Sequence, residues 1–333
     1  MRKLNVYGYV IRGTQYDIPF AEMIMSCVPF ADGIHIVTDQ RFNDGTLEKL
    51  RSMEQVIPSL HIHSVSLDWE NPAIDGATKQ LAKEYCDAPV LMQMDADEVV
   101  REEDVPKIQH LKENWPTNHT VIATGVINWF NGHNIKLSAA GSLKERFHLN
   151  NLDIYHGIPT HLRVPIHGTD YYYAQPESTD GAGLIDGSGN PIAYDLIFAN
   201  GDDPRKDFNN DDSIWIHHCS WVSLPRKWEM KQTWHWMWGR LFGRYDNLDE
   251  YTKDLDGEPV NFWGRSHIKP NESYIQPIKD EMKDNSIVSA TSIPIPIVMQ
   301  PWWGRQRIYV SRPWPFSDKK INMSNEPYRF SKT

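Results

Sequence analysis

The sequence has few cysteines, no long hydrophobic run and no excess of basic residues, and each absence excludes a class of protein. Three widely spaced cysteines among 333 residues exclude a disulfide framework and a thiolate zinc site, and they fit a reducing compartment. No stretch approaches the ~18 consecutive apolar residues that a membrane helix requires, and the apolar run at the start of the chain is interrupted by polar residues. We therefore predict a soluble, cytoplasmic protein.

The charge balance excludes a nucleic-acid surface. The 44 acidic residues outnumber the 34 Lys and Arg residues, and the formal net charge is -10. Binding to a phosphate backbone needs a basic field, so no nucleic-acid partner is expected. An anionic ligand would have to be held by a metal ion or by a few local cations.

The first half of the chain alternates between strand-like and helix-like segments. Three β-α repeats feed a fourth, nearly continuous apolar strand, which predicts an α/β fold with a mostly parallel central sheet flanked by helices. Asp17 is expected to cap the first helix, with Pro19 in its first turn. The predicted strands are 4–11, 33–39, 60–67 and 89–95, and the predicted helices are 17–30, 44–56 and 72–86.

The pattern continues with a predicted helix over 102–115 and strands over 120–130 and 142–149, and it becomes irregular from about residue 155. A strand over 214–224 and a helix over 226–243 follow, and then a Pro- and Trp-rich extension. We assign residues 1–150 to a ligand-binding half. Residues 151–333 form an aromatic-rich second half with a C-terminal extension, packed with the first as one continuous unit.

Acidic residues end three of the predicted strands. Asp39 ends the second strand, Asp68 ends the third, and "DADE" (Asp95 to Glu98) follows the fourth. The carboxyl ends of parallel strands meet at one edge, where ligands bind in such sheets. Asp95 and Asp97, with Glu98 beside them, could bind Mg²⁺ or Mn²⁺ through oxygen. The alternative is a solvated acidic turn that caps the next helix.

At this point the sequence resembles the glycosyltransferase family 2. "VTDQRFNDGTLEKL" and "QMDADEVV" carry the resemblance, which covers residues 1 to about 130. It implies a GT-A (Rossmann-like) nucleotide-diphospho-sugar transferase fold. It also implies that Asp39 and Asp44 contact the nucleotide base and ribose. Gln40 departs from the family pattern, which leaves the base preference open.

The family's D-x-D motif corresponds to Asp95, Ala96 and Asp97. The resemblance implies that this motif binds the metal ion and the diphosphate of the donor. Independently of the resemblance, glycosyl transfer needs stabilisation of the charge that develops on the leaving diphosphate, and a carboxylate-held cation supplies it.

Four further residues are candidates for the donor site. Ile11 and Arg12 follow the first strand and could line a slot for the base, although Arg12 could equally be a surface cation. Asp68 could contact the base or ribose, or could be a surface residue beside a helix. Lys79, on the third predicted helix, could reach a phosphate, whereas most helix lysines are solvated.

A histidine pair lies in "IHHCSWV". The segment from His218 onward is similar to an H-Y-G-W-V pattern in the family's C-terminal part, and this implies that His218 is a further metal ligand or diphosphate contact. Imidazole is a reasonable ligand for Mn²⁺. Strand alternation would point His217 and His218 to opposite faces. The alternative for His218 is a packed histidine beside Trp221.

An inverting transfer needs a base, because the acceptor hydroxyl loses a proton as it attacks. The candidates are Glu145 and three residues of an acidic loop, Asp203, Asp211 and Asp212, of which Glu145 and Asp211 are the ones we carry forward. Glu145 could instead pair with Lys144 or Arg146. The resemblance suggests inversion, but retaining enzymes share the motif.

Tryptophans concentrate in the second half of the chain. Trp234 and Trp238 are four residues apart and would share one face of a helix. Core packing explains part of this set, and exposed aromatic patches commonly mark binding sites. We expect an acceptor carbohydrate, or another hydroxyl acceptor, near Trp129, Trp234 and Trp238.

Together these features predict a metal-dependent glycosyltransferase that uses a nucleotide-diphosphate sugar, a UDP-sugar by preference, with Mn²⁺ or Mg²⁺ at Asp95, Asp97 and His218. Two alternatives stay open. A sugar-phosphate nucleotidyltransferase would carry a Gly-rich basic loop early in the chain, of which "IRGTQYD" is a poor version. A non-catalytic carbohydrate-binding protein would explain the tryptophans but not the acidic cluster.

Overall fold

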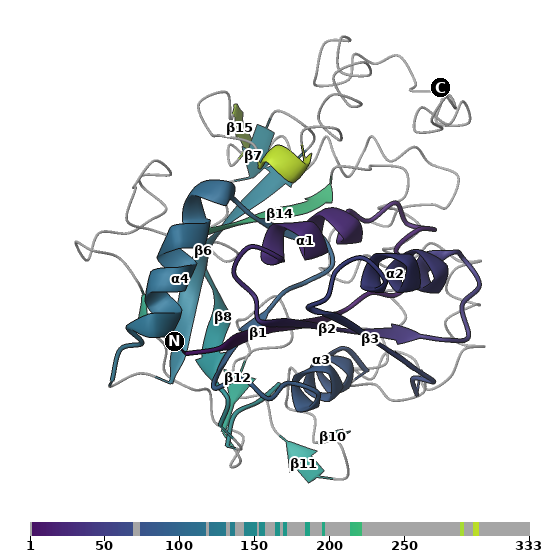
Figure 1. Ribbon diagram of the computed structural model, residues 1–333, viewed down its shortest axis with the longest axis horizontal. Helices are drawn as coiled ribbons and strands as arrows, with labels where there is room; N and C mark the ends of the chain where they lie inside the picture. Colours follow the sequence, from purple (N-terminus) through teal and green to yellow (C-terminus); the bar gives the residue numbers. More distant parts are fainter. Residues whose placement is uncertain are drawn as a thin grey trace.

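The fold is seen in a computed structural model of the chain (Figure 1). The structure describes residues 2–68, 74–117, 120–130, 134–136, 143–151, 153–156, 164–166, 169–171, 184–186, 195–196, 214–221, 287–289 and 296–299. The predicted helix over 226–243 and the Pro- and Trp-rich extension, apart from two short segments, lie outside these residues.

The described chain forms four α-helices, two 3₁₀ turns and fifteen strands. The helices are α1 (Phe20–Cys27), α2 (Thr46–Glu54), α3 (Ile74–Glu84) and α4 (Val105–Glu113), with 3₁₀ turns η1 (Glu102–Asp104) and η3 (Ile297–Met299). The longer strands are β1 (Leu4–Tyr9), β2 (Gly33–Asp39), β3 (Leu60–Val65), β4 (Val90–Gln93), β6 (Val121–Phe130), β8 (Leu143–Leu149) and β14 (Trp215–Trp221). The short strands are β5 (Glu98–Val100), β7 (Asn134–Lys136), β9 (Tyr155–His156), β10 (Val164–Ile166), β11 (Thr169–Tyr171), β12 (Leu184–Ile185), β13 (Asp195–Leu196) and β15 (Ile287–Ser289).

One large sheet organises the fold, with the strand order β15-β7-β6-β8-β4-β1-β2-β3. The predicted β-α repeats are confirmed in β1 to β4, which pair in parallel. The prediction of a mostly parallel sheet is wrong for the sheet as a whole, because β8 runs antiparallel to both β4 and β6, and β7 runs antiparallel to β6. The sheet is therefore mixed. The physical reason lies in the length of the connections: β6 ends at Phe130, β7 spans Asn134–Lys136 and β8 begins at Leu143, whereas parallel neighbours need a crossover of a dozen or more residues.

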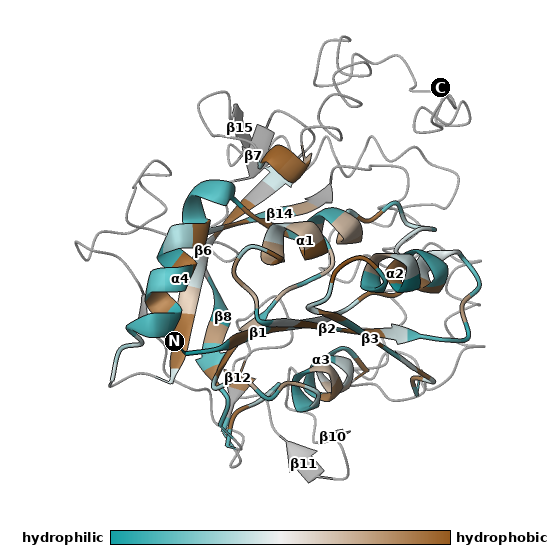
Figure 2. Cartoon of the chain, viewed as in Figure 1, coloured by the Kyte–Doolittle hydropathy of each residue, from teal (hydrophilic) through white to brown (hydrophobic). Residues whose placement is uncertain are grey.

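Helices cover both faces of the parallel part of the sheet. The main core joins α1, α2 and α4 to one face, where Phe20, Leu50 and Ile108 pack against β-strand residues such as Ile36. A second cluster on the other face joins Ile74 of α3 to the sheet. Figure 1 shows α1 and α2 on one side of β1 to β3 and α3 on the other. Figure 2 shows hydrophobic residues of the strands lying between these helices.

The helices predicted between residues 17 and 115 are present as α1 to α4, and the start of α1 differs from expectation. α1 begins at Phe20, after Pro19, and no side chain caps it. Asp17 is not its N-cap, because Asp17 lies in the preceding turn with φ of 53°. At α2, Gly45 takes the cap position with φ of 85°, a conformation that favours glycine. The Asp44 carboxylate accepts a hydrogen bond from the Thr46 amide at 3.2 Å, so an acidic residue does support the start of α2.

Strands β1 and β4 approach closely just before the acidic motif. A Cβ atom placed on Gly8 would lie 2.2 Å from the carbonyl oxygen of Met94. We expect Gly8→Ala to destabilise the protein by roughly 1–3 kcal/mol, because the backbone must move to accept the methyl group. Chemical denaturation measures this loss. An unchanged free energy of unfolding would mean that the two strands separate freely.

In the part of the chain that the structure describes, every helix is too short or too polar to traverse a lipid bilayer. Cys27, Cys86 and Cys219 are buried and unbridged, in agreement with the expectation from their spacing.

Candidate functional site

The acidic motif forms a tight turn where β4 leaves the sheet. The Asp95 carbonyl accepts a hydrogen bond from the Glu98 amide at 3.0 Å, and the Glu98 carboxylate in return accepts one from the Asp95 amide at 3.0 Å. Ala96, at the second position of the turn, packs partly against the main core. These reciprocal bonds fix the conformation of the turn and so fix the directions in which Asp95 and Asp97 point.

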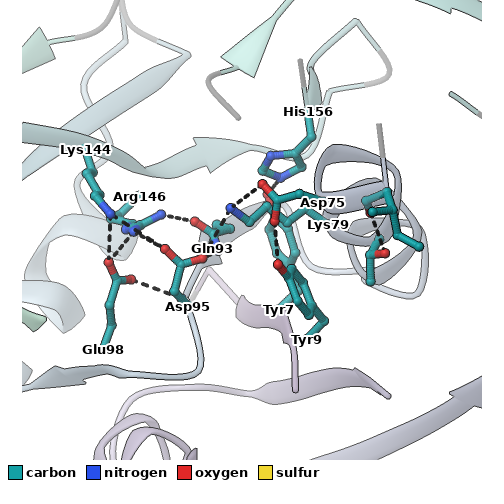
Figure 3. A network of polar contacts seen from close by, with 12 residues as sticks. Tyr7, Tyr9, Asp75, Lys79, Gln93, Asp95, Glu98, Lys144, Arg146 and His156 are labelled. Carbon is teal, nitrogen blue, oxygen red and sulfur yellow. Dashed lines mark hydrogen bonds and ion pairs between the residues drawn. The ribbon is translucent and has the colours of Figure 1, made fainter. Parts of the chain in front are cut away.

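Asp95 lies among positively charged side chains of the protein itself (Figure 3). Its Oδ1 atom lies 3.3 Å from Lys79 Nζ, and its Oδ2 atom lies 2.9 Å from Arg146 Nη2 and 3.7 Å from Lys144 Nζ. Gln93 also donates to Oδ1 at 2.9 Å. Burial would raise the pKa of Asp95, but Lys79, Arg146 and Lys144 outweigh it and hold the pKa well below its usual range.

Glu98 is the deepest carboxylate of the motif and has no solvent exposure. It forms an ion pair with Arg146, and Lys144 lies 3.6 Å away. A buried carboxylate needs such partners because the interior does not solvate charge. Lys79 completes the network through Asp75 at 3.4 Å. Three cations thus face three carboxylates, and the buried network is balanced in formal charge.

Arg146 reaches this position through an irregularity in β8. Phe147 pairs with Ile122 and Glu145 pairs with Ala123, so Arg146 is an extra residue without a partner position on β6. Such a bulge re-aims a side chain relative to the regular pleat. The guanidinium contacts Gln93, Asp95 and Glu98 together. One side chain therefore ties the end of β4 to both ends of the acidic turn.

Asp97 points to a different neighbour. Its Oδ1 atom lies 3.4 Å from Nε2 of His218, and its carbonyl accepts a hydrogen bond from the Cys219 amide at 2.6 Å. His218 stands opposite Glu98 in the antiparallel pairing of β14 with β5. The side chains of Asp97 and His218 keep 14% and 20% of their surface exposed, which is less than the 25% of Asp95 but more than the 0% of Glu98.

The two adjacent histidines of β14 face different surroundings, as the alternation predicts. His217 is fully buried, and its Nδ1 atom accepts a hydrogen bond from the Trp129 indole at 2.8 Å. Trp129 itself is 1% exposed. The expectation that Trp129 is a platform for the acceptor is therefore wrong in this structure. Its ring is buried and stacks on the His217 ring, and its N–H donates to His217. Trp234 and Trp238 lie outside the described residues.

The residues fit a divalent cation in part. Among the residues that the structure describes, no three His, Cys, Asp or Glu side chains are arranged to hold a metal ion. The separation of 3.4 Å between Asp97 and His218 is close to the ~3 Å expected for adjacent ligands at ~2.1 Å from one Mg²⁺-like ion. Asp95 fits poorly, because Lys79, Lys144 and Arg146 surround it. Each positive charge at ~4 Å from a divalent cation would cost several kcal/mol of repulsion even at an effective dielectric of about 20.

Two of the predicted nucleotide contacts are occupied by local interactions. Asp39 is buried at the end of β2, and Arg41 grips both of its oxygens, at 3.0 Å through Nε and at 2.7 Å through Nη2. Asp44 accepts hydrogen bonds from the Gln15 amide at 3.0 Å and from the Thr46 hydroxyl at 2.6 Å. Asp44 therefore joins the loop after β1 to the start of α2.

The loop after β1 carries Ile11 and Arg12. The Arg12 guanidinium lies 4.2 Å from the centre of the Phe42 ring and donates to the Tyr16 hydroxyl at 3.1 Å. Arg12 also has a positive φ of 50°, which is uncommon for a residue with a side chain. This loop, Asp39 and Asp44 all lie at the carboxyl ends of the parallel strands, which is where the sequence places the donor site.

The remaining candidates fall in separate places. Asp68 is exposed beyond β3, and Lys79 is buried within the ion network. Burial lowers the pKa of Lys79, but Asp75 and Asp95 outweigh burial and the pKa lies above its ordinary value. Glu145 lies half-buried on β8 between Lys144 and Arg146. Asp211 lies outside the described residues. The roles of Glu145 and Asp211 as bases stay predictions.

Sequence reasoning missed Gln93, Lys144 and Arg146 as parts of the site. Gln93 is a polar residue within an otherwise apolar buried strand, and a buried polar side chain needs a partner. The sequence alone predicts Lys144 and Arg146 only as ion-pair partners of Glu145. The bulge that turns the Arg146 side chain toward Asp95 cannot be recognised from the amino-acid sequence.

No protein-family model matches this chain, and no curated protein sequence matches it. Solved structures do match. Staphylococcus aureus TarS 1-349 in complex with UDP matches at 14% identity and a TM-score of 0.33, over 47% of this chain and 50% of that one. This chain thus spans half the length of that TarS chain. A second TarS 1-349 structure matches at 11% identity and a TM-score of 0.36, over 90% of this chain and 77% of the other.

The glycosyltransferase GlyE of Streptococcus pneumoniae TIGR4 matches at 11% identity and a TM-score of 0.25, over 37% of this chain and 30% of that one.

Proposed function

We propose that this chain is a glycosyltransferase that moves a sugar from a nucleotide-diphosphate donor, a UDP-sugar by preference, to a hydroxyl acceptor. The observation that carries the proposal is the arrangement at the carboxyl end of the parallel strands. There the Asp95–Glu98 turn is locked by an internal ion network, while Asp97 faces His218 at 3.4 Å. Such an edge is the usual ligand crevice of this sheet type.

Each part of the site has a role in this proposal. Asp97 and His218 hold Mn²⁺ or Mg²⁺, which when bound supplies positive charge against the leaving diphosphate. The loop at Ile11 and Arg12 borders the nucleotide. Asp39 and Asp44 line the nucleotide region. Arg41 fixes the side chain of Asp39, and Thr46 fixes the side chain of Asp44.

Inversion is part of the proposal and follows from the resemblance to family 2. It requires a group that takes the proton of the attacking hydroxyl. Glu145 and Asp211 stay the candidates for this base, and Trp234 and Trp238 stay the candidates for acceptor contacts.

Release of UDP from a panel of UDP-sugars tests the proposal, with Mn²⁺ present or chelated. We expect metal-dependent release by the wild type and a loss of about 100-fold or more in Asp97→Ala, the scale set by removing a group that stabilises the leaving charge. Glu113→Gln, an exposed residue at the end of α4, is the matched control and should retain full activity.

Other results would assign another function. Pyrophosphate release from a nucleoside triphosphate and a sugar phosphate would indicate a nucleotidyltransferase. Carbohydrate binding that is indifferent to metal, without any UDP release, would indicate a binding protein. Equal rates in Asp97→Ala and the wild type would remove Asp97 from the reaction.

A further inference from the structure

Strand β3 ends the large sheet on one side, and among the described residues it pairs only with β2. Two side chains of α2, Arg51 and Glu54, contact the backbone of β3 on the side that faces away from β2, here called the outer edge of β3. We infer that this pair closes a surface at which β3 would otherwise pair with β3 of a second copy of the chain. Strands β1 and β2 separate this edge from the acidic turn after β4, so the inference is independent of the proposed function.

The backbone of β3 turns alternate residues toward β2 and away from it. The Ser59 carbonyl accepts a hydrogen bond from the Ile34 amide at 2.7 Å, and the Val65 carbonyl accepts one from the Gln40 amide at 2.9 Å. Ile62 is three residues from both Ser59 and Val65 and therefore lies in the opposite phase. Its N–H and C=O point away from β2, and these are the groups through which a further strand joins a sheet.

Arg51 and Glu54 occupy both of these backbone groups. Glu54 Oε1 accepts a hydrogen bond from the Ile62 amide at 2.7 Å, and Arg51 Nη1 donates to the Ile62 carbonyl at 3.1 Å. Arg51 Nη1 also donates to Glu54 Oε2 at 2.7 Å, which closes a ring of bonds, and Arg51 Nη2 donates to the Ser64 hydroxyl at 3.2 Å. Figure 1 shows α2 beside β3. The two side chains thus take the place of a neighbouring strand at Ile62.

The bonds to the backbone are the main structural effect of the pair. Arg51 and Glu54 keep 45% and 30% of their side-chain surface exposed, and an ion pair so exposed contributes little stability by itself. Burial would raise the pKa of Glu54, but the Ile62 amide and Arg51 outweigh it and hold the pKa below its ordinary value. The carboxylate therefore remains an acceptor for the Ile62 amide at neutral pH.

The strand itself carries no protection against pairing. Natural edge strands are commonly guarded by a charged residue or a proline within the strand. β3 reads LHIHSV and has neither. It also contains the β-branched residues Ile62 and Val65, which favour strand pairing. The guard for this edge is instead supplied by α2.

A second copy of β3 fits this edge because of the symmetry of an antiparallel pair. Two residues that lie directly opposite each other in such a pair can exchange both of their N–H···O bonds. With a two-fold axis at Ile62, the N–H and C=O of Ile62 in one copy would bond to the C=O and N–H of Ile62 in the other. Such an isologous contact is the commonest way for identical chains to associate. The groups it needs are the two that Glu54 and Arg51 occupy.

Sedimentation equilibrium of the double variant Arg51→Ala/Glu54→Ala tests the inference. We expect the dissociation constant of its dimer to fall at least about tenfold below that of the wild type, because the pairing regains two backbone hydrogen bonds. Glu48→Ala/Lys49→Ala is the matched control, since it removes the same two charges from exposed positions of α2 and leaves the edge covered. Equal dissociation constants in the two double variants would overturn the inference.

A charge swap separates occupation of the edge from electrostatic repulsion between copies. Arg51→Glu/Glu54→Arg keeps both charges, but it places a donor against the Ile62 amide and an acceptor against the Ile62 carbonyl. We expect this variant to associate as strongly as the alanine variant. A swap variant as monomeric as the wild type would show that charge alone prevents association, and would refute the role of the backbone bonds.

Amide hydrogen exchange locates the contact and needs only the wild type if a variant does not fold. In the wild type the Ile62 amide should be protected, and Glu54→Gln should keep this protection because the amide oxygen still accepts. Exchange of the wild-type Ile62 amide at the rate of an unstructured chain would overturn the inference. In the alanine variant this amide should be unprotected in dilute protein and protected in concentrated protein. Association without protection of Ile62 would place the contact elsewhere and would also overturn it.

Discussion

Replacing Arg146 with Met should lower the free energy of unfolding by about 3–5 kcal/mol, the range for breaking a buried ion pair by removing one partner. The substitution leaves the fully buried Glu98 carboxylate with Lys144 at 3.6 Å as its nearest remaining cation, and it removes one of the cations around Asp95. Against a typical total of about 5–15 kcal/mol, this loss is a large fraction of the stability.

Urea denaturation of the wild type and Arg146→Met at pH 7.5 measures the effect. Arg2→Met is the matched control, because Arg2 is exposed ahead of β1, and surface substitutions change stability by at most about 0.5 kcal/mol. A similar small change in both variants would show that the buried network contributes little net stability. In that case the turn would be held mainly by its backbone bonds.

The parallel half of the fold was predictable because local signals agree there. Residues 33–39 contain the β-branched apolar residues Ile34, Ile36 and Val37, and β2 is buried along its whole length. The antiparallel arrangement of β6, β7 and β8 was not predictable, because strand direction depends on the connection and on long-range pairing. The mispredicted start of α1 has a local cause: Asp17 adopts a positive φ, so the chain turns once more before Phe20.

The candidate site was predictable in its location but not in its electrostatics. The sequence indicated the acidic turn because it follows a strong strand pattern, and the resemblance to family 2 indicated His218. The sequence does not show which positive charges neutralise Asp95 and Glu98. In the structure, Lys79, Lys144 and Arg146 do so. These three residues come from α3 and β8, and one sequence does not show that these elements meet at β4. Register and the bulge at Arg146 decide that contact.

A second large effect is expected on acidification. Burial, reinforced by Lys83, lowers the pKa of His148 to about 3, and burial, reinforced by Lys79, lowers the pKa of His156 well below its ordinary value. Burial, reinforced by Arg101, does the same for His217. Folding therefore requires these imidazoles to be neutral.

Hydrogen bonds around Tyr7 show why two of these histidines resist protonation. His148 Nδ1 lies 2.8 Å from the Leu149 carbonyl and must donate to it, so Nε2 of neutral His148 accepts from the Tyr7 hydroxyl at 2.8 Å. The Tyr7 oxygen is then left to accept from Nε2 of His156 at 2.5 Å. A proton added to His148 would need the site of the Tyr7 proton, so it breaks this chain of bonds.

The sign of the pH effect follows from these lowered pKa values. The unfolded chain binds protons near pH 6.5 and the folded chain does not, so the stability is fully present above pH 6.5 and falls as the pH drops toward the folded pKa values. Each such histidine costs about 2 kcal/mol at pH 5, and His148, His156 and His217 together cost about 6 kcal/mol. That sum is comparable to the whole stability of many domains, so unfolding is expected near pH 5.

Free energies of unfolding between pH 7.5 and pH 5 test this expectation. Below pH 6.5, His148→Asn should reduce the slope of stability against pH by about 1.4 kcal/mol per unit, the contribution of one proton. Gln109→Asn, on the exposed surface of α4, is the control without a titrating group and should leave the slope unchanged. Identical slopes in the two variants would mean that His148 takes up its proton in the folded protein. That result would contradict the hydrogen bond from Tyr7 to His148, because a protonated Nε2 could not accept it.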